Sequence, residues 1–178
     1  RLNTNRIDVM LLHSPPPDFN WQKYDRSLLE KLVDQGRIGA YGVSCRTVDC
    51  AKRVIKAKFG SVLEVIYNLV DQRARRIFDL PNSGRYSFVV KSPLAYGLVT
   101  RDPDSKFGRS DHRSQLDHKL RNSINDSVRH LRFLEDLPGG MSLSAIRFVL
   151  SEPRFNVVIP GMHRIEHVKD AVQAMILG

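Results

Sequence analysis

The sequence predicts an α/β protein built on a parallel sheet. Short apolar runs alternate with stretches whose apolar residues recur every three or four positions, and turn-forming Gly, Pro, Asn and Ser residues separate them. Strands that alternate with amphipathic helices are typical of βαβ units, whose right-handed crossovers lay helices over a parallel sheet. A length of 178 residues suits one domain, so we expect residues 1–178 to form a single domain.

The composition is that of a globular protein. Hydrophobic residues make up 42% of the chain and charged residues 26%, which excludes a disordered chain or a collagen. Cys45 and Cys50 are too few for a disulfide scaffold, so we expect a reducing, cytoplasmic environment. No apolar run reaches the ~18 residues of a membrane span, and we expect no membrane partner. The formal charge of +9 favours anionic partners, phosphate groups first.

The first half of the chain carries three expected strands, over residues 7–14, 38–44 and 62–69. The first is a nearly continuous apolar run that stops at three prolines, which indicates a strand buried on both faces. Amphipathic helices are expected between the strands, over 25–35 and from an N-cap at Thr47 to about Lys58. Gly36 is the expected stop of the first helix.

The second half carries two more expected strands, over 87–92 and 156–159. Helices are expected over four segments: 73–80, 115–137, 142–151 and 164–176. The apolar stripe of the last helix should face inward through Val168, Ala171, Val172 and Met175. Residues 101–112 contain Asp, Pro, Gly and Ser and form one long loop, and long loops in compact domains tend to be functional.

Polar residues, glycines and prolines gather where the five expected strands end. In parallel α/β folds, the chemistry lies on the loops that leave the carboxyl ends of the strands. These ends carry, in chain order, His13, Ser44, 68–73, 92–98 and 160–164. From the pattern alone, a histidine in such a place is more often satisfied by a neighbour than catalytic, and Arg164 is equally well explained as the solvated start of a helix.

Five motifs at these strand ends follow one another in register: LLHSP, YGVS, YNLVDQR, KSPLAYGLVT and VVIPG. With them the whole chain resembles the aldo-keto reductases. The resemblance implies a parallel (β/α) barrel of the TIM type that is incomplete here, with about five βα units that correspond to strands 4 to 8 of the family. It also implies an oxidoreductase that reduces aldehyde or ketone groups of small molecules with NADP, or with NAD, and without a metal.

The resemblance assigns roles residue by residue. His13 matches the catalytic histidine, whereas the family's catalytic Asp, Tyr and Lys belong to the first barrel units, which this sequence lacks. Ser44 is expected to contact the carboxamide of the cofactor. Further cofactor contacts are expected at Asn68, Gln72, Ser92, Pro93, Leu94, Gly97, Pro160, Gly161 and Arg164, with Ser92 to Leu94 beside the pyrophosphate. Glu64 stands where the family often has Gln.

Two aromatic residues, Trp21 and Tyr96, could line a pocket for an apolar carbonyl substrate, although packing over the core explains them equally well. His163 and His167 lie four residues apart, but no third ligand is obvious and we expect no metal. Basic residues of the segment 73–76 lack an accompanying aromatic platform, so we expect a solvated helix face rather than a nucleic-acid partner.

The missing first units leave a second function open. The chain could be a non-catalytic cofactor-binding or interaction protein of the same lineage. Five strands of a barrel leave two open edges with unpaired N–H and C=O groups. We therefore expect self-association, or pairing with the missing N-terminal barrel units, and a stable monomer in sedimentation at micromolar concentration would contradict this.

Overall fold

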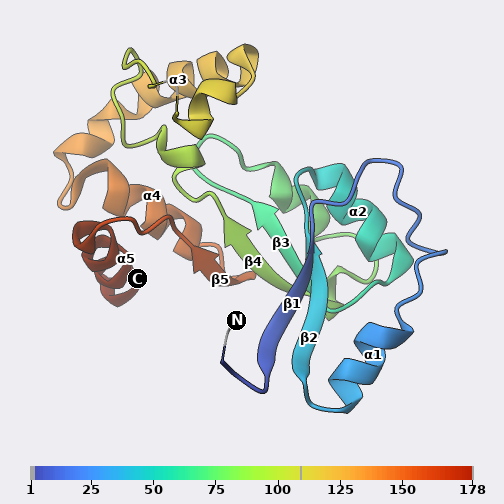
Figure 1. The fold of residues 1–178 in the computed structure, drawn as a ribbon. Helices are drawn as coiled ribbons and strands as arrows, with labels where there is room; N and C mark the ends of the chain where they lie inside the picture. Colours follow the sequence, from blue (N-terminus) through green and yellow to red (C-terminus); the bar gives the residue numbers. More distant parts are fainter. Residues whose placement is uncertain (1–2, 109, 178) are drawn as a thin grey trace. The chain divides into compact units, whose positions relative to one another are not determined.

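A computed structural model describes residues 3–108 and 110–177 of the chain (Figure 1). Five strands form one sheet in the order β1-β2-β3-β4-β5. The ladders from β1 to β2 and from β2 to β3 are parallel. The expected α/β class with a parallel sheet is confirmed.

The chain divides into two compact units. Unit 1 comprises Arg1–Ile66 and Arg73–Val89, and unit 2 comprises Tyr67–Gln72 and Val90–Gly178. The boundary falls inside the fourth strand, and a single domain for residues 1–178 stays a prediction. No helix among the described residues is both long enough and apolar enough to cross a membrane.

The regular elements of unit 1 occur close to where the sequence predicts them. They are β1 (Ile7–His13), α1 (Ser27–Asp34), β2 (Ile38–Ser44), α2 (Val48–Ala57), β3 (Val62–Ile66), the 3₁₀ helices η1 (Arg73–Ile77) and η2 (Ser83–Arg85), and the start of β4 (Ser87–Lys91).

Helix α2 confirms the predicted N-cap. The hydroxyl of Thr47 accepts a hydrogen bond of 3.1 Å from the backbone N–H of Cys50, which satisfies one of the free donors of the first turn. Lys58 ends the helix with left-handed backbone at φ +52°. The buried face consists of Cys50, Ala51, Val54 and Ile55.

Two glycines allow β2 to lie close to the chain around β3. A Cβ atom at Gly42 would lie 1.7 Å from the carbonyl oxygen of Val62. Gly60 has φ +63°, and a Cβ there would lie 2.4 Å from the carbonyl oxygen of Tyr41. Since only glycine tolerates both contacts, these positions secure the register in which Ser44 pairs with Glu64.

The first strand is not buried on both faces, and that expectation is wrong. Met10 is 41% exposed and Val9 is similarly exposed. The physical reason is position: β1 stands at one end of the sheet and pairs with β2 alone. A continuous apolar run predicts a strand but does not say how many of its sides are covered.

The α-helices of unit 2 are longer than those of unit 1. The regular elements of unit 2 are the end of β4, η3 (Ala95–Gly97), η4 (His112–Gln115), α3 (His118–Leu131), η5 (Arg132–Asp136), α4 (Gly140–Leu150), β5 (Phe155–Ile159) and α5 (Ile165–Leu177).

The single helix expected over 115–137 is three elements in the structure. Asp117 lies between η4 and α3, and its carboxylate accepts a hydrogen bond of 3.0 Å from the backbone N–H of Leu120. This N-cap starts α3 afresh at His118, and the chain tightens into 3₁₀ geometry after Leu131. Within α3, Ile124 and Val128 are buried in the core of unit 2.

Helix α5 faces a different way from the one its apolar stripe predicts. It packs against α4 through Ala174 and Ala171, beside Leu143 and Ile146 (Figure 1). The expected inward position is correct for Ala171 and wrong for the others, because the larger apolar residues of the stripe are exposed: Val168, Val172 and Met175. The small alanine side chains allow the two helices to approach closely, which a count of apolar residues does not reveal.

Candidate functional site

In unit 1, the sheet register places His13, Ser44 and Glu64 in one row. His13 pairs with Ser44 and Ser44 pairs with Glu64, so the three residues lie on adjacent strands. The backbone N–H of Ser14 donates to the carbonyl of Ser44 at 2.9 Å, and that of Cys45 donates to the carbonyl of Glu64 at 2.8 Å. The ladder therefore holds the row together.

The side chains of this row differ in exposure. Ser44 is only 3% exposed, and its hydroxyl donates a hydrogen bond to the carboxylate of Glu64. Because the hydroxyl of Ser44 directs its hydrogen toward Glu64, the two side chains offer oxygen acceptors to a ligand. Such acceptors suit a ligand with N–H donors, for example a primary amide. The imidazole of His13 is exposed at the carboxyl end of β1, where a small molecule can reach it.

Trp21 lies in an aromatic cluster of unit 1. Its ring centroid lies 4.5 Å from that of Phe19 and 5.0 Å from that of Phe59, and its side chain is buried. The indole Nε1 has no hydrogen-bond partner within residues 3–108 and 110–177. This arrangement is the packing alternative that the sequence left open, and a role of Trp21 in a substrate pocket stays a prediction.

In unit 2, the loop after β4 has an unusual backbone. Ser92, Ala95, Tyr96 and Gly97 all have positive φ, at 55°, 45°, 61° and 76°. Left-handed backbone costs a residue other than glycine on the order of 1 kcal/mol, and such strain concentrates at ligand-binding sites. The loop that the family resemblance assigns to the cofactor is thus the most strained segment among those described in unit 2.

Asn68 fixes the conformation of this loop through hydrogen bonds. It is 2% exposed, and its amide N–H₂ donates to the carbonyl of Ser92 at 3.0 Å. Its amide oxygen accepts from the backbone N–H groups of Val70 at 3.0 Å and Asp71 at 2.8 Å. This turn ends β3 at Ile66, earlier than predicted. The structure therefore shows Asn68 as a positioning residue, and a direct contact with a cofactor stays a prediction.

The other residues of unit 2 that are predicted to contact cofactor or substrate differ in their exposure. Pro93 is buried, and Leu94 packs its side chain against the core, so only its backbone is suited to a polar ligand. Gln72 is exposed and donates to the carbonyl of Leu69 at 3.3 Å. Tyr96 and Gly97 are half-buried.

The turn before α5 is exposed. Gly161 and Arg164 lie at the surface and Pro160 is half-buried. Within the described part of unit 2, no hydrogen bond or ion pair joins residues 160–164 to the loop 92–97, and a shared role of the two segments in cofactor binding stays a prediction. The backbone N–H of His163 instead donates to Nδ1 of His167 at 3.3 Å.

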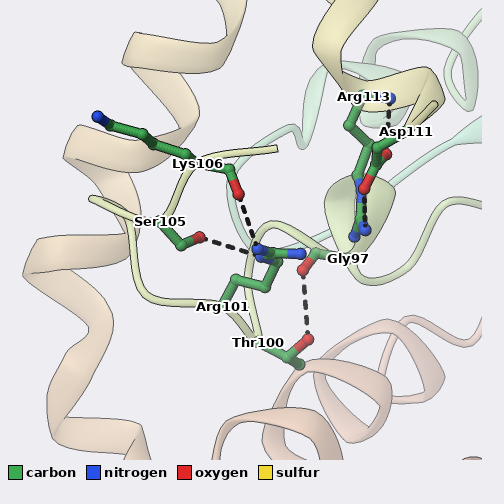
Figure 2. A network of polar contacts seen from close by, with 7 residues as sticks. All are labelled: Gly97, Thr100, Arg101, Ser105, Lys106, Asp111 and Arg113. Atoms are coloured by element: carbon green, nitrogen blue, oxygen red, sulfur yellow. Dashed lines mark hydrogen bonds and ion pairs between the residues drawn. The ribbon is translucent and has the colours of Figure 1, made fainter. Parts of the chain in front are cut away.

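Sequence reasoning missed a cationic cluster around Phe107 in unit 2. The guanidinium carbons of Arg101, Arg113 and Arg121 lie 4.8, 5.0 and 5.9 Å from the ring centroid. Arg113 forms an ion pair with Asp111 at 2.6 Å, and this hydrogen bonding raises the pKa of the Arg113 guanidinium (Figure 2). These arginines follow no periodic pattern, and the only signal in the sequence is their number between residues 101 and 121.

Comparisons with known proteins agree on one family. A family model described as the Aldo/keto reductase family matches residues 1–177. The uncharacterized oxidoreductase YqkF of Bacillus subtilis (strain 168) is 24% identical over 176 residues, which cover 98% of this chain and 56% of that protein. The chain thus spans about half the length of this relative.

Solved structures give the same answer for the fold. The holo form of aldo-keto reductase AKR11C1 from Bacillus halodurans superposes with a TM-score of 0.70 at 24% identity, over 96% of this chain and 56% of that one. The glycerol dehydrogenase AKR11B4 from Gluconobacter oxydans gives 0.67 at 20% identity, over 96% and 54%. At these identities, the likeness establishes the fold alone.

Proposed function

The chain belongs to the aldo-keto reductase family, and from that membership we propose that it serves the reduction of aldehyde or ketone groups with NADP, or with NAD. The observation that carries the proposal is the match of the family over residues 1–177. We also propose that the five-stranded sheet is part of an incomplete (β/α) barrel of the TIM type.

The chain's polar groups fit a nicotinamide cofactor in two places. In unit 1, the acceptor oxygens of Ser44 and Glu64 suit the N–H₂ of a carboxamide. In unit 2, we assign phosphate contacts to the loop from Ser92 to Gly97 and to Arg164. The N–H groups of Ala95 and Gly97 already donate within the loop, whereas the exposed guanidinium of Arg164 can form charge-assisted bonds with phosphate. Asn68 would keep the loop in shape before the cofactor arrives.

His13 is the proposed catalytic residue among those present. When bound, the cofactor supplies the hydride. The exposed imidazole of His13 would donate a hydrogen bond from a ring nitrogen to the carbonyl oxygen of the substrate and so hold it in place. Proton donation by Tyr with its Lys and Asp would require residues outside these 178. We therefore propose that this chain binds cofactor but does not complete turnover alone.

Exposed apolar residues on the two end strands support the proposal that the chain pairs with further barrel units or with itself. Val9 and Met10 lie on β1, and Val157 and Ile159 lie on β5, and all are between 41% and 49% exposed. End strands with exposed apolar residues are sites of strand addition. Trp21 and Tyr96 remain proposed pocket residues for the substrate.

Fluorescence titration tests the proposed function. Trp21, the single tryptophan, would report the addition of NADPH and NADH to the purified chain, and the same sample would then be assayed for aldehyde and ketone turnover. We expect saturable binding without turnover. Turnover would show that His13 does not need the residues outside the chain. Absence of binding would contradict the proposal.

A further inference from the structure

We propose that unit 2 contains a binding site for a small oxyanion, a phosphate ester or a carboxylate, in the groove between loop 101–108 and helix α3, with Arg121 as its principal cation. This site goes beyond the proposed function, and it does not require a cofactor to be bound.

The groove is large enough for a small polar molecule, with a volume of about 640 Å³. Its walls come from the loop, from Ser114 of η4 and from the part of α3 between Arg121 and Arg129. Most of the lining side chains are polar or charged: Pro103, Asp104, Ser105, Lys106, Phe107, Ser114, Arg121, Asn122, Asn125, Asp126 and Arg129. An apolar ligand would leave these groups without partners, so the lining favours a polar one.

The two carboxylates of the groove share one cation, Arg129, so their negative charge is offset in part. The guanidinium of Arg129 forms ion pairs with Asp104 at 2.6 Å and with Asp126 at 2.7 Å. These contacts raise the pKa of Arg129, with the hydrogen bond to Asp104 as the main cause. Both acidic side chains therefore repel an incoming anion less than free carboxylates would.

Of the three arginines beside Phe107, Arg113 is paired with Asp111, whereas Arg101 and Arg121 contact other groups. Arg121 contacts Nδ1 of His118 at 2.9 Å. Figure 2 shows that Arg101 donates to the hydroxyl of Ser105, at 3.0 Å, and to the carbonyl of Lys106, at 3.4 Å. None of these partners is a carboxylate. Within the described residues, neither guanidinium forms an ion pair with a carboxylate.

Like charges held on one aromatic ring repel one another, and a bound oxyanion would offset that repulsion. Arg121 and Lys106 line the groove directly, whereas Arg101 lies on the ring of Phe107, which forms part of the wall. Ser114 and Asn122 add neutral donors.

The amide of Asn125 donates to the carbonyl of Pro103 at 2.8 Å and so ties the loop to α3. The groove is thus organised before a ligand enters.

Calorimetric titration of the full chain with inorganic phosphate and with succinate tests the site. The variants are Arg121→Gln and, as a second case, Arg101→Gln. Lys119→Gln is the matched control, because it removes one positive charge from the exposed part of α3 without touching the groove. We expect Arg121→Gln to weaken anion binding about tenfold or more, as loss of a charge-assisted hydrogen bond does, Arg101→Gln to weaken it less, and the control to leave it unchanged.

Each outcome of these titrations either supports or overturns the proposed anion site. Tighter binding of phosphate supports a phosphate ester and tighter binding of succinate supports a carboxylate. Absence of saturable binding for both anions, or equal binding by wild type and Arg121→Gln, would overturn the proposal. Displacement of the anion by NADPH would also overturn it, because the groove would then be part of the cofactor site. NADPH binding is measured on the same samples, so failure of the proposed function is seen separately.

Discussion

Helices α2 and α5 both have an apolar stripe, and the two stripes have opposite environments. In unit 1, α2 buries four residues of its stripe against the core. In unit 2, α5 buries Ala174 alone and exposes the larger residues of the stripe. An amphipathic pattern therefore predicts that a helix forms. It does not predict which element covers the apolar face, because the rest of the fold decides that.

The two strand-end regions differ in a similar way. In unit 1, the row of His13, Ser44 and Glu64 follows from the ladder register. In unit 2, the loop 92–97 depends on left-handed backbone and on the buried amide of Asn68. The first region is built by regular structure and the second by individual side-chain contacts, so single substitutions should damage the second more selectively.

A matched pair of isoleucines gives the largest expected difference between α2 and α5. Ile55 on α2 is 1% exposed and Ile165 on α5 is 70% exposed. We expect Ile55→Ala to lower the free energy of unfolding by about 2–5 kcal/mol and Ile165→Ala to change it by no more than about 0.5 kcal/mol. Urea unfolding followed by circular dichroism measures both. An equal loss would mean that α5 is covered in solution.

Asn68→Ala should have the next largest effect. The substitution takes away the acceptor of the N–H groups of Val70 and Asp71 and one of the two donors to the carbonyl of Ser92, which keeps the N–H of Ala95, at a cost of about 1–3 kcal/mol. Gln115→Ala, at an exposed glutamine of unit 2, is the control. Urea unfolding and limited proteolysis of the loop 92–97 follow the change. Unaltered proteolysis would show that Asn68 does not hold the loop.

The smallest effect is expected for Tyr86→Phe, as a change in the pH dependence of stability at alkaline pH. Burial raises the pKa of the Tyr86 phenol in unit 1, where the hydroxyl donates to the carbonyl of Val54 at 3.2 Å. The unfolded tyrosine ionises near pH 10, so the folded state loses stability as the pH rises above about 10. Tyr86→Phe should cost about 1 kcal/mol at pH 8 and reduce this alkaline loss. Urea midpoints between pH 8 and 11 test it, and an unchanged pH slope would contradict it.

Much of the fold could be predicted because local chemistry decides it. Thr47 caps α2 and Gly36 has the φ of +67° that ends the first helix. The ladder then brings His13 beside Ser44 as parallel pairing requires. Other features depend on contacts between residues that are distant in sequence. The amide of Asn68 reaches Ser92, and Arg101 and Arg121 meet on the ring of Phe107.

Exposure was the least predictable property. The apolar run of β1 is compatible with burial on one face or on both, and only the position of the strand in the sheet decides between them. For α5, the choice between the alanine face and the valine face depends on the shape of α4. Neither fact is a property of the local sequence.

Ser44 is proposed to help to hold a nicotinamide cofactor. Calorimetric titration of NADPH into the wild-type chain, Ser44→Ala and the exposed control Ser61→Ala tests it most directly. We expect saturable binding to wild type and control, and binding about tenfold weaker in Ser44→Ala because a hydrogen-bonding group is lost at the site. Equal affinities in all three chains, or no binding to the wild type, would contradict it.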